Sequence, residues 1–221
     1  MYDVEEFLVK HIEGYLFADI EAIIEYVPVK HPGAVGYPIV MSVCSGIEML
    51  GALMEGKQES PYSSKDVIKY FGHYWKYYLF NANPAYKQHV ELARNLIRNA
   101  LAHGFATKPG IGVTRQGNLL HLQVYNGQFI INANCFYEDF KQSYLQHAKP
   151  LIFNGGKLHK LAQKRLNEML VKYEKEANAI FKEGQLTKDN TELNSYTPSI
   201  NQIMSDNTIT TTTSGTTLDI S

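Results

Sequence analysis

The feature that most limits what this chain can fold into is a long apolar stretch between Pro38 and Glu55. A proline at the first turn and apolar residues on every side predict a helix that other elements must surround. The stretch approaches the length of a membrane span, but Glu48, two serines and two glycines interrupt it. We therefore expect a buried core helix and no membrane partner. Ser42 and Gly46, four residues apart, would let a second helix approach closely, in the same chain or in a second subunit.

Helical periodicity continues along most of the chain. Apolar residues at spacings of three and four predict further helices over residues 3–26, 65–80, 85–103, 135–148 and 157–182. Prolines separate several of these segments, with Pro28, Pro84 and Pro150 at expected breaks. The hydrophobic share of 44% is enough to give such helices a common core. The predicted fold class is mainly α, a helical bundle.

One segment, residues 119–132, has the period of a strand instead. Apolar and polar residues alternate on both sides of Asn126–Gly127, which is a strong two-residue hairpin turn. The expected cross-strand pairs are Val124 with Phe129 and Leu122 with Ile131. The sequence therefore predicts a single β-hairpin inserted into the bundle.

The composition changes near Thr187, where threonine, serine and asparagine begin to dominate. Too little apolar material follows to offset the entropy of an ordered chain, so we expect a disordered C-terminal tail. The predicted organisation is one helical domain over residues 1–186 and a tail over residues 187–221.

Charge is distributed unevenly although the net charge is only −1. Residues 1–59 carry ten acidic groups and three lysines, whereas residues 60–188 carry eighteen basic groups and eight acidic ones. Such a basic region permits a polyanionic partner, but lysine-rich helices are more often simply solvated. Two cysteines are too few for a disulfide framework, and acidic residues follow Met1 where a signal peptide would need lysine or arginine. We expect a cytoplasmic protein.

The candidate functional residues lie on the helix predicted over residues 85–103. Successive residues of a helix are rotated by about a hundred degrees, so the apolar residues of this segment form one arc. The polar residues lie on the opposite side and on a neighbouring stripe. These polar residues are Arg94, Asn95, Arg98, Asn99 and His103. Arginine holds phosphate with a fixed fork of donors, and histidine transfers protons near neutral pH. An arginine, an amide and a histidine at one helix end suit the cleavage of RNA without a metal ion.

The segment from Arg98 to His103, Arg-Asn-Ala-Leu-Ala-His, resembles the motif of the HEPN ribonucleases (higher eukaryote and prokaryote nucleotide-binding domains). That motif is an arginine, a polar residue that is often asparagine, and a histidine a few positions on. HEPN domains are small all-α bundles in which the motif ends a central helix. By this resemblance, which covers six positions and their helical setting, Arg98 and His103 are catalytic and Asn99 supports them. Arg94 and Asn95, about one turn earlier, are then expected to contact the substrate.

The resemblance also implies a function and an assembly. HEPN domains include toxins of toxin–antitoxin pairs, abortive-infection proteins and CRISPR-associated ribonucleases, and they commonly dimerise so that two motifs face one RNA site. The leading hypothesis is therefore a metal-independent endoribonuclease that acts on single-stranded RNA as a homodimer, in a toxin or phage-defence context, with an antitoxin or other protein as a further partner. No cofactor and no metal is expected.

Several alternatives remain beside this hypothesis. A histidine at a helix C-terminus is also an ordinary dipole partner, and the same polar face would suit a non-catalytic helical module that binds a protein partner or a nucleotide. Glu48, a lone carboxylate on an apolar helix, is expected to form a structural ion pair with Arg94 or Arg98, or else to lie at an interface. The aromatic row between Tyr70 and Phe80 could stack bases, but rings at this density more often form a core or a subunit interface.

Overall fold

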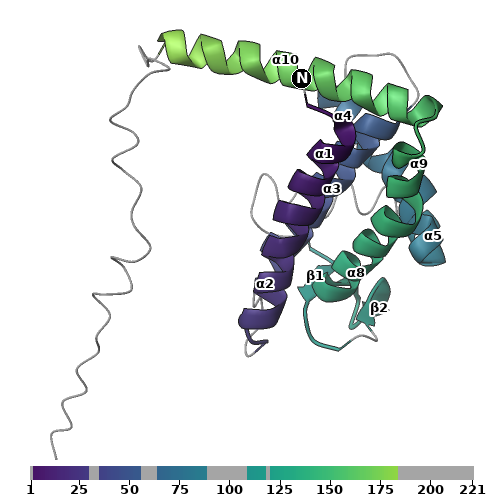
Figure 1. Cartoon of the computed structure of the whole chain (residues 1–221). Coiled ribbons are helices and arrows are strands. Elements are labelled where there is room, and N and C mark those ends of the chain that lie inside the picture. The colour runs from purple at the N-terminus through teal and green to yellow at the C-terminus, as the bar shows by residue number, and fades with distance from the viewer. Residues whose placement is uncertain (1, 30–34, 56–63, 89–108, 118–119, 184–221) are drawn as a thin grey trace, which may run out of the picture. The chain divides into compact units, whose positions relative to one another are not determined.

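A computed structural model describes the chain except for residues 1, 30–34, 56–63, 89–108, 118–119 and 184–221. It divides the chain into two units, Met1–Tyr173 and Glu174–Ser221. The described part of the second unit is the end of the last helix. The architecture below is that of the first unit, which is mainly α as expected (Figure 1).

The helices follow the predicted segments closely. The N-terminal helix consists of α1 (Val4–Leu8), η1 (Val9–Phe17) and α2 (Ala18–Tyr26), and Asp3 caps it by accepting hydrogen bonds from the backbone N–H groups of Glu5 and Glu6. The other helical elements are α3 (Gly36–Met54), α4 (Ser64–Tyr74), η2 (Trp75–Leu79), α5 (Phe80–Ala82), η3 (Pro84–Gln88), α8 (Ala133–Ser143), η6 (Tyr144–Ala148), α9 (Lys149–Phe153) and α10 (Lys157–Glu183). The predicted helix over 85–103 lies outside the described residues beyond Gln88.

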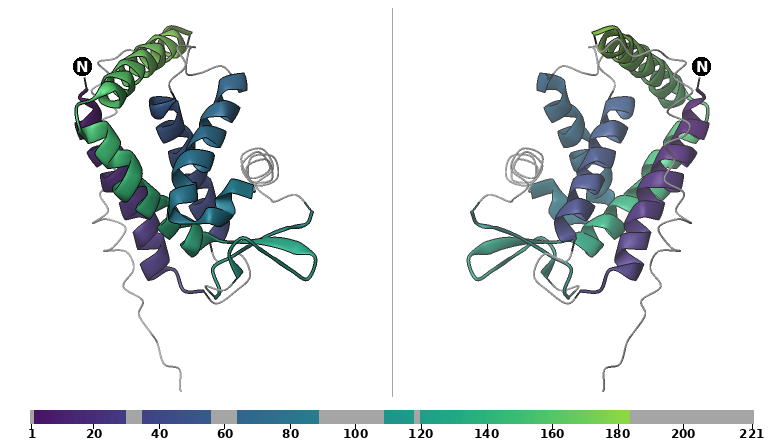
Figure 2. Two further views of the ribbon diagram at one scale, coloured as in Figure 1. Left: turned by 90° about the vertical axis from the view of Figure 1, so that its right-hand side faces the viewer. Right: turned by 90° about the vertical axis from the view of Figure 1, so that its left-hand side faces the viewer.

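Helix α3 is the central element, as its all-round apolar character predicted. It packs most extensively against α4 and α8, and Figure 2 shows it between neighbouring helices. A Cβ added at Gly46 would lie 2.7 Å from both Leu16 and Phe140, so the close approach expected at this glycine is made within the chain. A Cβ at Gly51 would lie 2.0 Å from the carbonyl oxygen of Tyr70, so there the backbones of α3 and α4 meet directly.

Helix α3 also has the length and hydropathy of a membrane span. Its most apolar window has a mean hydropathy of 1.5, and 61% of that window is buried inside the protein. A mostly buried core helix shows the same two properties. Among the described residues, α3 is the only helix that is both long enough and apolar enough to cross a membrane.

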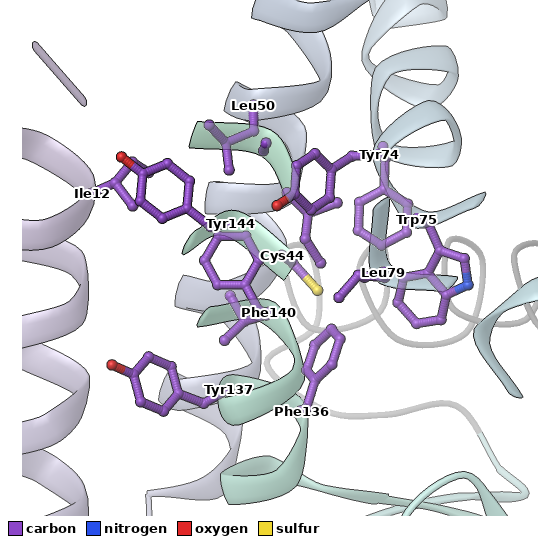
Figure 3. Packing of buried hydrophobic residues seen from close by; sticks show 14 of the residues in the cluster. Ile12, Cys44, Leu50, Tyr74, Trp75, Leu79, Phe136, Tyr137, Phe140 and Tyr144 are labelled. Carbon is purple, nitrogen blue, oxygen red and sulfur yellow. The ribbon is translucent and has the colours of Figure 1, made fainter. Parts of the chain in front are cut away.

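Aromatic side chains from three segments form much of the core (Figure 3). Trp75 stacks on Phe71, and Phe17 meets the ring of Tyr144 edge-on. Most of the aromatic row between Tyr70 and Phe80 is therefore core, as expected for rings at that density. The fully buried aromatic residues are Trp75, Tyr74, Tyr86, Tyr137, Tyr144, Phe71, Phe136 and Phe140.

The β structure is larger than the predicted hairpin. Strands β2 (Gln123–Tyr125) and β3 (Gln128–Asn132) form that hairpin, and Val124 pairs with Phe129 as expected. Asn126 and Gly127 both have positive φ angles, as a tight hairpin turn requires. A further strand, β1 (Ile111–Thr114), pairs with β3 in parallel, so the sheet has the order β1-β3-β2. The expectation of a hairpin alone was therefore wrong.

The helix before Pro150 continues further than predicted. The sequence places its end at Ala148, but helical structure runs from Ala133 through Pro150 to Phe153. Proline lacks an N–H group and its ring clashes with the carbonyl one turn earlier. The turn before Pro150, η6, is π-helical, and this wider winding accommodates the proline without ending the helix.

Two similar polar clusters join the N-terminal helix to the segment 137–149. Glu21 accepts hydrogen bonds from Tyr137 and Lys141, and Glu13 accepts hydrogen bonds from Tyr144 and Lys149. The hydrogen bonds from Lys141 and Tyr137 hold the pKa of Glu21 below its ordinary value. Each glutamate thereby fixes one point of contact between the two helical segments.

Candidate functional site

The residues of the predicted motif lie outside the described part of the chain. Arg94, Asn95, Arg98, Asn99 and His103 all belong to the segment 89–108. Glu48 is described and is half-buried near the middle of α3. Its proposed ion pair with Arg94 or Arg98 stays a prediction, because both arginines lie in that segment.

The chain immediately before this segment is fixed by a buried tyrosine. Tyr86 lies in η3 and is fully buried, and its ring meets that of Trp75 edge-on at 4.9 Å between centroids. The indole N–H of Trp75 donates to the carbonyl oxygen of Tyr86 over 2.7 Å. Both the ring and the backbone of Tyr86 are therefore held against η2.

The hydroxyl of Tyr86 belongs to a polar cluster with His121 and Asp139. It donates to Oδ2 of Asp139 over 2.9 Å and lies 2.7 Å from Nε2 of His121. The other ring nitrogen of His121, Nδ1, accepts from the backbone N–H of Asn132 over 3.2 Å. That bond places the proton of the neutral ring on Nε2, which then donates to Tyr86.

Burial keeps Tyr86 and the nearby Cys135 protonated. Desolvation raises the pKa of Tyr86 well above its ordinary value, and the adjacent Asp139 carboxylate raises it further. Desolvation, with Asp139 as a second cause, also raises the pKa of the Cys135 thiol. Neither group is therefore an activated nucleophile, and the cluster serves to hold η3, the sheet and α8 together. Sequence reasoning missed it because its members are scattered along the chain.

The chain that follows the segment 89–108 is also fixed. The backbone N–H of Phe129 donates to the carbonyl oxygen of Gly110 over 2.7 Å, and β1 begins at the next residue. Just after β1, Arg115 donates to the carbonyl oxygens of Ile24 and Val27, and to Oδ1 of Asn134. The chain on both sides of the predicted motif is thus bound to the helical core.

A groove lies on another part of the surface, along α4, η2 and α5. Its volume is about 790 Å³, and Leu151 of α9 and Glu55, at the end of α3, complete its wall. The residues that line it are Glu55, Lys69, Gly72, His73, Lys76, Tyr77, Tyr78, Asn81 and Leu151. Two lysines, two tyrosines, a histidine and an amide therefore share one surface with a single carboxylate.

The electrostatics of the groove centre on His73. Desolvation by burial lowers the pKa of His73, and the nearby Arg165 lowers it further, whereas Glu55 opposes the shift. His73 is therefore neutral at pH 7. Oxygen Oε2 of Glu55 is buried and has no hydrogen-bond partner among the described residues, a state that is rare for a buried carboxylate.

The described residues offer no metal centre. They contain no group of three histidine, cysteine, aspartate or glutamate side chains that could hold a metal ion.

No family model matches this chain, and no curated protein or solved structure does either.

Proposed function

We propose that this chain is an HEPN-like, metal-independent endoribonuclease that cleaves single-stranded RNA. The observation that carries the proposal is the motif from Arg98 to His103, on a segment with helical periodicity in a mainly α protein. The described chain on both sides of this segment supports it, because Tyr86 and β1 bind the flanks to the core. A cytoplasmic protein of a toxin or phage-defence system is the proposed context.

The proposed mechanism assigns each residue a step. Arg98 holds the scissile phosphate with its fork of N–H donors, and His103 assists proton transfer. The ribose 2′-oxygen loses its proton and forms a bond with phosphorus, while the bond to the leaving 5′-oxygen breaks and that oxygen gains a proton. Asn99 orients these groups, and Arg94 and Asn95 contact the neighbouring RNA. The chain supplies these groups itself, so the proposal includes no cofactor.

Cleavage of labelled single-stranded RNA by the purified protein tests this proposal. His103→Ala and Arg98→Ala should each abolish cleavage, and Asn99→Ala should weaken it, because Asn99 orients groups and transfers no proton. Chelating agents should have no effect on the wild type. Melting curves of the three variants serve as the control, because the residues are predicted on the polar side of their helix and their loss should leave the fold intact.

Two outcomes would favour the alternative function, a non-catalytic module that binds a protein or a nucleotide. One is wild-type protein that leaves RNA uncut between about pH 5 and pH 9, a range that spans the pKa of histidine. The other is loss of stability in Arg98→Ala, which would indicate that Arg98 is the structural partner of Glu48.

The proposal includes a homodimer in which two motifs face one RNA molecule. Sedimentation of the wild type at tens of micromolar should then give twice the mass of one chain, because ordinary specific interfaces are occupied at about this concentration. A monomer at this concentration would contradict the shared site.

A further inference from the structure

We propose that the groove along α4, η2 and α5 binds single-stranded nucleic acid, with a base against Tyr77 and the backbone phosphates at Lys69 and Lys76. The inference goes beyond the proposed function, because it concerns described residues outside the motif. It holds whether or not the protein cleaves what it binds.

The first argument is the position of Tyr77 among its neighbours. The rings of Tyr74 and Trp75 are buried in the core, whereas Tyr77 is 55% exposed and lines the groove. His73 lies beside it at 5.0 Å between ring centroids. An exposed ring at the wall of a groove gives a base a stacking surface whatever its sequence.

The second argument is the placement of the cations. Nζ of Lys76 lies over the Tyr77 ring, 5.5 Å from its centroid, and Lys69, seven residues earlier on the same helical segment, also lines the groove. Residues seven apart on a helix lie on one face, so the two lysines form a short row along the groove. A base on Tyr77 would then have its adjoining phosphates within the field of this row.

The third argument is the polar lining of the groove. Glu55 lines it, and the edges of nucleobases carry N–H donors that a carboxylate oxygen can accept. Asn81, which also lines the groove, has both a donor and an acceptor. These groups suit a base and its phosphate better than a phosphate alone.

Fluorescence anisotropy with two labelled oligonucleotides of about 12 nucleotides, a length within the usual site size, tests this inference. One is RNA and the other is DNA of the same sequence. The DNA has no 2′-hydroxyl and cannot be cleaved by the proposed mechanism, so it measures binding alone. Binding of DNA together with intact RNA would contradict the proposed ribonuclease and leave the groove assignment standing.

The variants should separate stacking from charge. Tyr77→Ala should weaken binding by about 5- to 100-fold, whereas Tyr77→Phe, which keeps the ring, should bind as the wild type does. Replacing Lys69 and Lys76 by alanine should reduce the slope of log affinity against log salt by roughly 0.7 for each lysine. Tyr26→Ala and Lys164→Ala serve as matched controls, since both residues are exposed and lie outside the groove.

Two results would overturn the assignment. The first is nucleic-acid binding that the groove variants leave unchanged while their melting temperatures equal that of the wild type, which would show that the nucleic acid binds elsewhere. The second is a loss of binding in the control variants equal to that in the groove variants, which would show that binding is not specific to the groove.

Discussion

Two of the four arginines, Arg115 and Arg165, are buried, and each donates to backbone carbonyls at the end of a helix. Arg115 donates to Ile24 and Val27, where α2 ends, and Arg165 donates to Ala52 in the last turn of α3. The last carbonyls of a helix have no partner within it and carry partial negative charge. The guanidinium of Arg115 satisfies two such carbonyls and that of Arg165 satisfies one, so these arginines act as caps supplied from other elements.

Replacing Arg115 should test this role. Arg115→Met should lower the free energy of unfolding by about 2 kcal/mol, because three part-buried acceptors would lose a charged donor. Arg115→Lys should restore only part of that loss, since an ammonium group cannot reproduce the planar fork. Urea denaturation measures both changes.

The matched control for Arg115 is Lys164→Met. Lys164 is exposed and pairs only weakly with Glu168 across one turn, so its loss should change stability by less than about 0.5 kcal/mol. A lysine at position 115 that gave wild-type stability would contradict the cap, because charge alone would then be sufficient.

At the scale of elements, the packing of α3 against α4 depends on Gly51. A side chain there would meet the backbone of α4 at Tyr70, and backbone cannot turn aside as a flexible side chain does. Gly51→Ala should therefore separate the two helices and lower the free energy of unfolding by about 2–4 kcal/mol. Thermal and urea unfolding of the variant measure the effect.

Gly14→Ala gives the comparison for Gly51. Gly14 is exposed in η1, and a Cβ there would lie in ordinary contact, 3.4 Å from the carbonyl oxygen of Val9. The variant should be as stable as the wild type or gain up to about 1 kcal/mol, because alanine favours helices. Equal losses at both glycines would indicate that helix propensity, and not the close approach, governs position 51.

The elements that the sequence predicted well are long helices in which the apolar pattern repeats many times. The helices predicted over 3–26 and 38–55 carry many apolar residues at helical spacing, so each residue reinforces the assignment. Strand β1 has four residues and a parallel partner that begins fourteen residues after its end, so no local pattern marks it. The passage of a helix through Pro150 depends on a π-helical turn, which leaves no sequence signal.

The candidate site was less predictable than the fold, because part of it joins residues that are far apart in the sequence. A motif such as Arg98 to His103 is local, so the sequence can suggest it, and its chemistry stays a prediction. The cluster of Tyr86, His121 and Asp139 joins residues 35 and 53 positions apart, and only folding brings them together. The aromatic row was expected to be core or interface, and its periodicity alone could not separate the exposed Tyr77 from the buried Trp75.

For the whole molecule, the partners of the N-terminal helix bear on the order in which the elements fold. Its hydrogen bonds to Arg115, Tyr137, Tyr144 and Gln163 come from parts of the chain that the ribosome makes much later. Helices α3 and α4, by contrast, are near neighbours in sequence, so bringing them together costs little loop-closure entropy. We therefore expect α3 and α4 to pack together before the N-terminal helix docks on its partners.

Pulse-labelled hydrogen exchange during refolding should show this order. Amides of α3 and α4 should gain protection before those of the N-terminal helix, and simultaneous protection would contradict the inference. In a cell, the N-terminal helix would then stay accessible to proteases and chaperones until these later partners are made.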